Sequence, residues 1–469
     1  MKEYTTTRQL MERYSVPGLV LRLGVPAMVG QVFNLLYSIV DRIFVGRIPG
    51  TGEQALAAIG ICAPALTAVS AFAYMVGIGG ASLMSISLGQ GNQRRAQQAL
   101  GNAFWLVIAI AVAVTAVLLP LHRPLLYLLG CSDALYPYAG AYFTIYLLGT
   151  VASLLGVGMN QFLLAQGYAR QGMIAVVLGA LANLVLDPLL IFGFGLGVRG
   201  AATATVLSQC AMAVYVLYQL RRPGMPVRLR PCRPQSALCR RIVAIGSMSF
   251  LITLLDNLII ILLNIVLRRY GGAQGDAWIT GATVVQSFLT IVFCPSQGIT
   301  TGCGTLFSYN YGAGNVKKVR QSFLWVFVLC AAYIGLMELA VQTAPAWFAG
   351  LFLQDETLLT MASLCLRRYT LVLLGVAVQY ALVDGLTAMG KVRFAFPLSV
   401  FRKLVYLGCL FLLPRLGGVE AVFYAGSLSD LIGAGFSAVA FFTVVWPRLR
   451  RELEAMKPDP ACQNRPERV

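Results

Sequence analysis

The chain reads Gly89-Gln90-Gly91-Asn92-Gln93-Arg94-Arg95-Ala96 at one point and Gly312-Ala313-Gly314-Asn315-Val316-Lys317-Lys318-Val319 at another, an offset of 223 residues. Each copy follows one long apolar stretch and precedes the next. Three more pairs recur in the same order at nearly the same offset: Gly24-Val25-Pro26-Ala27 with Gly246-Ser247-Met248-Ser249, Leu147-Leu148-Gly149 with Leu373-Leu374-Gly375, and Ala165-Gln166-Gly167 with Ala388-Met389-Gly390. One short glycine-rich fragment can recur by chance, but four in constant order predict two homologous halves, an arrangement typical of membrane transporters.

The composition places these halves in a membrane. Hydrophobic residues make up 58% of the chain and charged residues 12%, whereas soluble proteins carry roughly 25% charged residues. An apolar run of about 20 residues suffices to cross a bilayer. Twelve such runs are present, at approximately 20–44, 55–87, 98–120, 137–160, 167–191, 198–219, 243–266, 278–306, 321–343, 360–386, 394–414 and 420–446.

The sequence therefore predicts an all-α polytopic membrane protein with twelve transmembrane helices in two six-helix lobes. Each lobe holds an even number of spans, so a pseudo-twofold axis along the membrane normal should relate them. The predicted divisions are an N-terminal lobe at 1–219, a cytoplasmic linker at 220–242, a C-terminal lobe at 243–446 and a cytoplasmic tail at 447–469. The first span lacks a small-residue cleavage pattern and is not read as a secretory signal.

The net charge of +18 has a topological explanation. When loops are assigned alternately to the two sides, most of the 36 basic residues fall on the side that holds both termini, the linker and both repeated loops. Cytoplasmic loops carry such an excess, which predicts a multi-pass cell-membrane protein with both termini cytoplasmic. The basic surface should contact anionic membrane lipids, and no nucleic-acid partner is expected.

Enzymatic and metal chemistry find little support. His122 is the only histidine, most of the 11 cysteines lie inside apolar spans, and no C-x-x-C pair occurs. Cysteine in such spans behaves as a small hydrophobic residue. The repeated glycine loop follows a helix and lacks the Lys-Ser/Thr of a phosphate-binding loop. No nucleophile with an accompanying base is apparent. We therefore expect neither an enzyme nor a cofactor.

Polar residues inside the first span share one helix face. Gln31, Asn34, Ser38 and Asp41 are spaced three or four residues apart, and Tyr37 lies one turn before Asp41. Such a stripe should face a cavity or a partner helix and not lipid. A solvated position beside the outer end of the span is the alternative for Asp41.

A second polar group lies in the fifth and sixth spans. Asn183 and Asp187 are four residues apart inside an apolar run, Pro188 follows, and Thr205 lies on the next helix. Two carboxylates, from Asp41 and Asp187, with an amide oxygen and a hydroxyl form an oxygen set suited to a hard cation. Close carboxylates in a low dielectric also suit a proton relay near neutral pH. The coupling ion is thus Na⁺ or H⁺, and Na⁺ is the one metal ion expected.

The C-terminal half carries acids at other positions. Asp256 lies in the middle of the seventh span, and Asp384 follows Tyr380 by one turn in the tenth. Gln286 adds polarity in the eighth span. We interpret Asp256 and Asp384 as cavity acids that receive a cationic substrate. The alternative is that one of them pairs with a base of the eleventh span, Arg402 or Lys403, for which Asp430 is the favoured structural partner.

These motifs resemble the multidrug and toxic compound extrusion (MATE) family, bacterial type, over residues 15–446. The resemblance is carried by Tyr37-Ser38-Ile39-Val40-Asp41-Arg42-Ile43-Phe44-Val45-Gly46, Ala55-Leu56-Ala57-Ala58-Ile59-Gly60, Asn183-x-x-x-Asp187-Pro188, Gly200-Ala201-Ala202-x-Ala204-Thr205 and the repeated Gly-x-Gly-Asn loop. It implies a V-shaped protein and cation-coupled export of bulky organic cations. It also implies an ion site at Asp41, Asn183, Asp187 and Thr205.

The prediction is a monomeric secondary antiporter that confers drug resistance by exporting lipophilic organic cations in exchange for H⁺ or Na⁺. The expected substrate-binding residues are Gln31, Asn34, Tyr37, Asp256, Gln286, Tyr380 and Asp384. The main alternative is a lipid-linked oligosaccharide flippase of the same superfamily. An intramembrane enzyme and a non-transporting scaffold or sensor are weaker alternatives, since the chain shows no catalytic motif and no soluble domain.

Overall fold

The computed structural model describes residues 7–230, 232–353 and 355–456, and every regular element in these ranges is a helix. This confirms the all-α prediction. The N-terminal lobe contains α1 (Thr7–Arg13), α2 (Val16–Gly46), α3 (Gly52–Gly89), α4 (Gln93–Leu128), α5 (Tyr136–Leu148), α6 (Thr150–Ala165), α7 (Ala169–Pro188), the π-helix η1 (Leu189–Gly193) and α8 (Gly197–Arg221).

The C-terminal lobe repeats this order with more interruptions. It contains α9 (Ser236–Gly271), η2 (Gly272–Gln274), α10 (Gly275–Gly312), α11 (Val316–Thr343), α12 (Pro345–Ala349), α13 (Glu356–Tyr369), α14 (Gly375–Gln379), η3 (Tyr380–Asp384), α15 (Gly385–Ala388), α16 (Val392–Gly417), η4 (Val419–Phe423), α17 (Tyr424–Ala440), η5 (Phe441–Val445) and α18 (Trp446–Ala455).

Both lobes interrupt the same predicted span. Ten helices are long and apolar enough to cross a membrane, and α5 with α6 forms a further span bent by 57°. The bend lies at Gly149, where a Cβ would overlap Val206 of α8. The tenth predicted span, 360–386, is divided among α13, α14, η3 and α15. There a Cβ on Gly375 would crowd the Asp430 carbonyl, so the repeated Leu-Leu-Gly marks a close helix approach in each half.

The repeated loops lie at an end of the molecule where the lobes meet. Gly91 and Gly314 have φ of +74° and +67°, a conformation that glycine adopts without strain, so each loop is a tight helix-to-helix turn. A Cβ on Gly89 would overlap the Tyr309 carbonyl oxygen, and one on Gly312 would overlap that of Ile86. Ile86 and Tyr309 are themselves separated by the repeat offset of 223 residues. The two contacts are therefore equivalent, as a pseudo-twofold axis requires.

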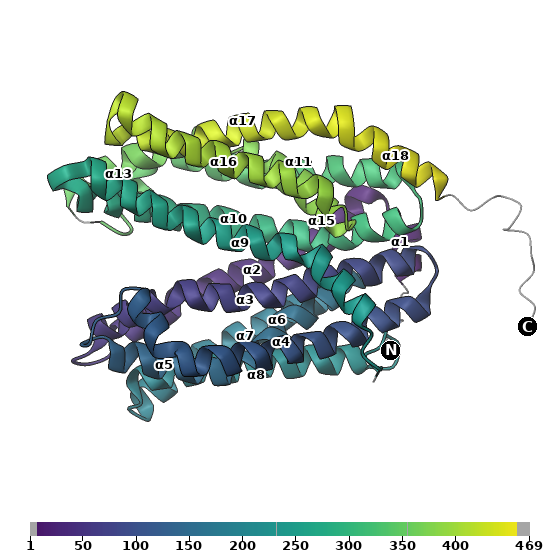
Figure 1. Cartoon of the computed structure of the whole chain (residues 1–469), viewed down its shortest axis with the longest axis horizontal. Helices are drawn as coiled ribbons and strands as arrows, with labels where there is room; N and C mark the ends of the chain where they lie inside the picture. The colour runs from purple at the N-terminus through teal and green to yellow at the C-terminus, as the bar shows by residue number, and fades with distance from the viewer. Residues whose placement is uncertain (1–6, 231, 354, 457–469) are drawn as a thin grey trace, which may run out of the picture.

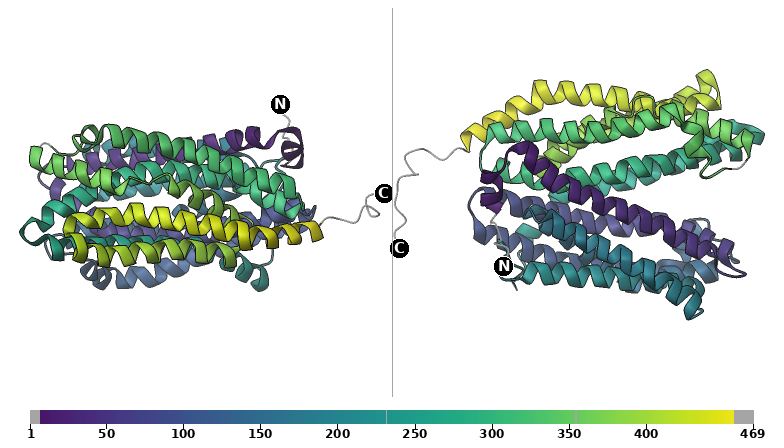
Figure 2. Two further views of the ribbon diagram at one scale, coloured as in Figure 1. Left: turned by 90° about the horizontal axis from the view of Figure 1, so that it is seen from above. Right: turned by 180° about the vertical axis from the view of Figure 1, so that it is seen from behind.

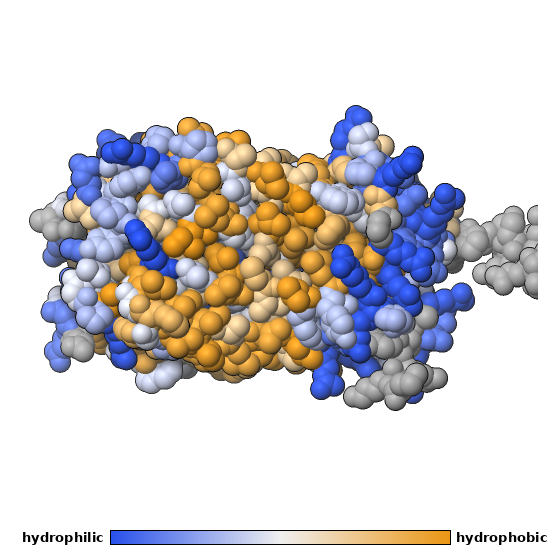
Figure 3. All heavy atoms as spheres, turned by 90° about the horizontal axis from the view of Figure 1, so that it is seen from below, coloured by the Kyte–Doolittle hydropathy of each residue, from blue (hydrophilic) through white to orange (hydrophobic). Residues whose placement is uncertain are grey.

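The lobes pack through α2 against α10 and α3 against α9. They lie together at the end that carries the repeated loops and diverge toward the other end, so the ribbon forms a V (Figure 1). The view from behind shows the same divergence (Figure 2). Hydrophobic side chains form a broad belt between two hydrophilic ends (Figure 3), the surface that a membrane-spanning protein presents to lipid.

The predicted linker at 220–242 is not a free connection. Residues 222–235 separate α8 from α9, and the side chains of Met225, Val227 and Leu229 are buried in the core of the N-terminal lobe. The Val227 amide donates to Gln166 Oε1 at 2.8 Å. The predicted tail at 447–469 begins as helix α18, while residues 457–469, like residues 1–6, lie outside the described residues.

Candidate functional site

Three helices of the N-terminal lobe carry the predicted ion-coupling residues. Asp41 lies near the end of α2, Asn183 and Asp187 lie on one face of α7, and Thr205 lies on α8. Helix α7 packs against both α2 and α8. Because residues four apart stack on the same helix face, this packing directs the two carboxylates and the amide toward a common interior.

The two acids of this group meet each other. Asn183 Nδ2 donates to Asp187 Oδ1 at 3.2 Å, and both residues are buried, with exposed fractions of 1% and 0%. The carboxyl groups of Asp41 and Asp187 lie near enough to influence each other electrostatically. Thr205 donates its hydroxyl hydrogen to the Ala201 carbonyl at 3.0 Å, so its oxygen can act only as an acceptor toward the site.

Several oxygens of the group lack a donor. Asp41 Oδ1, Asn183 Oδ1 and Asp187 Oδ2 are buried and receive no hydrogen bond from any residue that the structure describes. Buried polar atoms are nearly always paired, and an unpaired one costs free energy. Ionised carboxylate oxygens only accept hydrogen bonds, so a proton, a water molecule or a metal cation can satisfy these oxygens. The donor set fits H⁺ or an oxygen-liganded ion such as Na⁺.

A small cavity of about 80 Å³ reaches two members of this group, Asn183 and Thr205. It can hold a few water molecules but is well below the roughly 300–1,000 Å³ of pockets for drug-sized ligands. Its lining includes Asn183 and Thr205, together with the predicted substrate residues Gln31, Asn34 and Tyr37. The polar stripe of α2 therefore faces the interior of the N-terminal lobe, in the same place as the ion-coupling group.

Sequence reasoning missed other polar residues around this cavity. Tyr74, Asn160, Gln161, Ser208 and Gln209 also line it, and both Asn160 Oδ1 and Gln209 Oε1 are buried without a donor in the described ranges. A signal was present, since Gln209 follows Thr205 by four residues and the Asn160-Gln161 pair interrupts an apolar span.

The predicted C-terminal acids have partners. Asp256 on α9 pairs with Lys403 on α16, and Asp430 on α17 accepts from Arg402 at 2.8 Å. The Asp256 side chain is 53% exposed, whereas that of Lys403 is 4% exposed. Asp384, on η3, accepts from the Thr300 hydroxyl of α10 at 2.6 Å. The alternative pairing of Asp256 with a base of the eleventh span is therefore the one that the structure contains.

The remaining C-terminal candidates lie around these acids without forming one group. Tyr380 donates its hydroxyl to the Phe293 carbonyl at 3.4 Å and packs its ring edge-on against Phe293. Gln286 is half-buried on α10, and its side chain makes no hydrogen bond to Asp256 or Asp384 among the described residues. The structure thus brings the N-terminal candidates together but leaves those of the C-terminal lobe dispersed.

Within the described residues, no cluster of three or more His, Cys, Asp or Glu side chains could hold a metal ion. The N-terminal group contains only two such side chains, Asp41 and Asp187, and its other oxygens come from an amide and a hydroxyl.

Comparison with known proteins identifies relatives along most of the chain. The profile of the MatE family matches residues 26–189 and 249–408. The multidrug export protein MepA of Staphylococcus aureus is 25% identical over 435 residues, which cover 91% of this chain and 93% of MepA. MepA of Staphylococcus haemolyticus is 23% identical over 425 residues, which cover 90% and 92%.

Solved structures share the fold. An outward-facing multidrug resistance MATE family transporter of the MOP superfamily superposes with a TM-score of 0.85 at 22% identity, covering 96% of this chain and 98% of that one. A MOP superfamily transporter from Pyrococcus furiosus, described as having a binding pocket of reverse polarity, gives 0.87 at 22% identity, covering 98% and 100%. These matches confirm the predicted two-lobed, twelve-helix fold class.

Proposed function

The chain belongs to the MatE family, and on that premise we propose that it is a secondary multidrug efflux transporter that exports lipophilic organic cations in exchange for Na⁺ or H⁺. Membership makes it a multi-span membrane transporter and not an enzyme. The names of its relatives, multidrug export proteins, support drug export. The identity of the substrates and of the coupling ion rests on the chemistry of the site.

The observation that carries the proposal is the set of unpaired oxygens between Asp41 and Asp187. No basic side chain forms an ion pair with either acid within the described residues. Two carboxylates in a low-dielectric interior repel each other strongly unless a positive charge lies between them. Arg42 follows Asp41 in the sequence but forms no ion pair with it, so a cation from solution can take the place between the two carboxylates. An ion that enters and leaves this site is what a coupled antiporter requires.

The shape of the molecule supports alternating access. The lobes meet at the end that carries the repeated loops and separate toward the other. If the basic end is cytoplasmic, as the distribution of Lys and Arg favours, this conformation opens outward. Opening to the cytoplasm would separate the backbone contacts at Gly89 and Gly312, and it would close the opposite end.

The small cavity in the N-terminal lobe suits the ion better than the drug. We place the drug between the lobes, where Asp256 is exposed on α9 and where Asp384, Gln286 and Tyr380 lie on neighbouring helices of the C-terminal lobe. A carboxylate and aromatic faces attract lipophilic cations through Coulomb and cation–π interactions. The cavity that Asn183 and Thr205 line is also lined by Gln31, Asn34 and Tyr37 of α2. These α2 residues would connect drug binding to the ion site.

The lipid-flippase alternative requires a cationic cavity for a pyrophosphate. Arg402 and Lys403 are the bases of the central spans, but each is paired with an acid. With Asp384 in addition, the acids of the C-terminal lobe outnumber these bases. The charge balance therefore favours a cationic substrate.

Proteoliposomes with imposed gradients test the proposal. Purified protein is reconstituted, a Na⁺ gradient or a pH gradient is applied separately, and the movement of ethidium is followed by fluorescence. We expect one gradient to drive ethidium transport and the other to have little effect. Ethidium movement that responds to neither gradient, together with rescue of a flippase-deficient strain, would replace the antiporter with the lipid flippase.

A further inference from the structure

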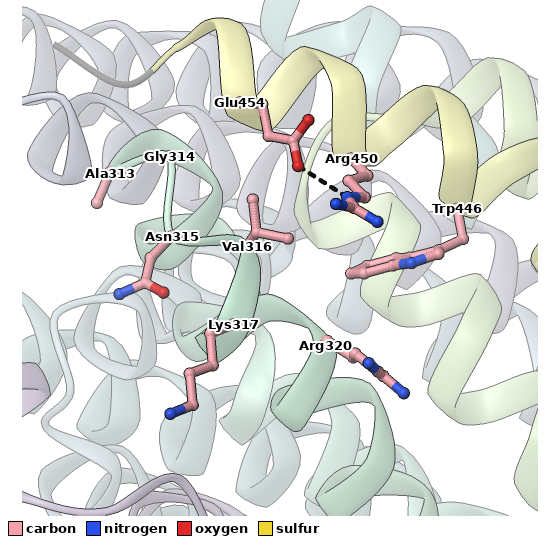
Figure 4. A pocket seen from close by; sticks show the side chains of 9 residues that line it. All are labelled: Ala313, Gly314, Asn315, Val316, Lys317, Arg320, Trp446, Arg450 and Glu454. Atoms are coloured by element: carbon pink, nitrogen blue, oxygen red, sulfur yellow. Dashed lines mark hydrogen bonds and ion pairs between the residues drawn. The ribbon is translucent and has the colours of Figure 1, made fainter. Parts of the chain in front are cut away.

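A second, larger hollow lies at the end of the molecule that carries the repeated loops. It has a volume of about 600 Å³, within the usual range for small-ligand sites, and lies between α18 and the start of α11 (Figure 4). Its lining residues are Ala313, Gly314, Asn315, Val316, Lys317, Arg320, Trp446, Arg450 and Glu454. None of them belongs to the ion or drug sites proposed above.

The charge of this hollow is positive. Three basic side chains and one acidic side chain line it. Arg450 Nε pairs with Glu454 Oε1 at 2.7 Å, whereas neither Lys317 nor Arg320 forms an ion pair with any residue that the structure describes. In Figure 4, Arg450 and Trp446 project from α18 toward α11, and Arg320 lies beneath the indole. Two exposed cations thus remain available to an anion.

The repeat shows how the other lobe treats the same position. At the offset of 223, Gln97 of α4 corresponds to Arg320 of α11. Gln97 Nε2 donates to the Arg228 carbonyl at 3.3 Å, and Gln93 Nε2 donates to the Pro226 carbonyl at 2.7 Å. In the N-terminal lobe, therefore, carbonyl groups of the linker accept hydrogen bonds from glutamine side chains in the first turns of α4.

The segment that corresponds to this linker in the C-terminal lobe is α18. A helix uses its carbonyls for its own hydrogen bonds, so α18 cannot supply acceptors to α11 as the linker does to α4. At the position of the neutral Gln97, the C-terminal lobe has the basic Arg320. The space between α18 and α11 beside Arg320 is the hollow. The two lobes thus differ at this position by a missing acceptor and an added positive charge.

The surroundings place the hollow at a membrane boundary. Immediately before it, Val439, Phe442 and Val444 are exposed to the extent of 63%, 70% and 43%, as expected for lipid-facing residues. Trp446 follows, and tryptophan is typical of the membrane–water interface. The polar residues of α18 come next, on a helix whose Leu449 and Leu453 are buried. The chain thus passes from the apolar belt to basic side chains at the hollow itself.

We propose that this hollow binds the phosphate of an anionic phospholipid headgroup, held by Arg320 and Arg450, with Lys317 adding positive charge at its rim and Trp446 against the glycerol region. Guanidinium groups match phosphate geometry and form charge-assisted hydrogen bonds with it. The shared chemistry is a phosphate ester, so a soluble glycerol phosphate could fill the same place. The other lobe has no equivalent site, because the linker occupies it.

Native mass spectrometry of the full chain tests this site. The probes are phosphatidylglycerol and phosphatidylcholine with identical acyl chains, titrated onto the detergent-purified protein. Lys317→Gln/Arg320→Gln is compared with Arg94→Gln/Arg95→Gln, which removes two basic side chains from the equivalent loop of the other lobe. At about fivefold for each basic side chain near a membrane surface, the first variant should bind phosphatidylglycerol roughly 25-fold more weakly, and the control variant should bind it nearly as wild type.

The outcomes separate the explanations. Thermal unfolding of both variants establishes that they are folded, which is expected because the substituted side chains lie at the surface. If millimolar glycerol phosphate displaces the lipid and binds alone, the ligand is a soluble phosphate ester at the same site; if it does not, the ligand is the lipid. Equal losses in the two variants, or no preference for phosphatidylglycerol over phosphatidylcholine, would mean diffuse surface charge and would overturn the proposal.

Discussion

The two lobes share a fold but differ in how the acids of their spans are paired. In the N-terminal lobe, Asp41 and Asp187 face each other with unpaired oxygens. In the C-terminal lobe, Asp256 and Asp430 each contact a fixed base, Lys403 and Arg402. A carboxylate that contacts a basic side chain has its counter-charge within the protein. Acids without such a partner can be neutralised by a cation from solution, and this difference supports the ion site proposed for the N-terminal lobe.

The largest effect should come from removing the unpaired charge. Asp187→Asn supplies an amide that can donate to Asp41, so the site no longer needs a cation. We expect gradient-driven ethidium transport to fall about 100-fold, the upper range of measured coupling between sites, while the protein inserts and folds. Transport in proteoliposomes at matched protein content measures this, with Glu12→Gln, an exposed acid of α1, as the control. Wild-type transport by Asp187→Asn would remove the ion site from this lobe.

A different defect is expected in the C-terminal lobe. Asp430→Asn leaves the half-buried Arg402 without its counter-charge, which should destabilise the fold by about 3 kcal/mol. Thermal unfolding in detergent measures the loss, and the double variant Asp430→Asn/Arg402→Met should recover most of it. Transport for each folded molecule should persist in the double variant. If ion coupling disappears in that variant although stability returns, the C-terminal pair takes part in coupling and the contrast between the lobes fails.

A smaller effect should distinguish substrates by charge. The Asp256 side chain is 53% exposed although it contacts Lys403, so under the proposed function its carboxylate should attract a cationic drug. Asp256→Asn should raise the concentration needed for half-maximal transport of dications by about fivefold, corresponding to roughly 1 kcal/mol, and that of monocations by less. Competition assays with a matched dication and monocation measure the ratio. A neutral substrate, if one is carried, should be unaffected, and equal shifts for all three would assign Asp256 a structural role only.

The smallest effects should come from the polar stripe of α2. Gln31→Ala and Asn34→Ala each remove one neutral hydrogen-bonding group beside the cavity, which is worth about 1 kcal/mol. We expect the order of preference among cationic drugs to change by a few-fold while the dependence on the ion gradient is retained. Resistance profiles of cells expressing each variant provide the measurement. Profiles identical to wild type would indicate that the stripe serves helix packing alone.

The fold was largely predictable because its determinants are local or repeated. Apolar runs of sufficient length predict spans whatever surrounds them, and the repeat predicts the lobes. The breaks in the fourth span of each half were not predicted, although both coincide with the repeated Leu-Leu-Gly. The burial of Met225, Val227 and Leu229 was not predicted either, because a stretch rich in Arg and Pro is typical of a linker between two lobes.

The sequence by itself determined which residues could form the N-terminal ion site. Asn183 and Asp187 share a helix face through their spacing alone, and charge inside an apolar run is costly wherever the helix lies. The tertiary structure alone decided which acids are left without a partner. Asp256 and Lys403 are 147 positions apart, and their pairing depends on how α9 and α16 pack side by side, which no local pattern encodes. Pairing between distant helices therefore separates an acid that can exchange an ion from one whose charge is already neutralised.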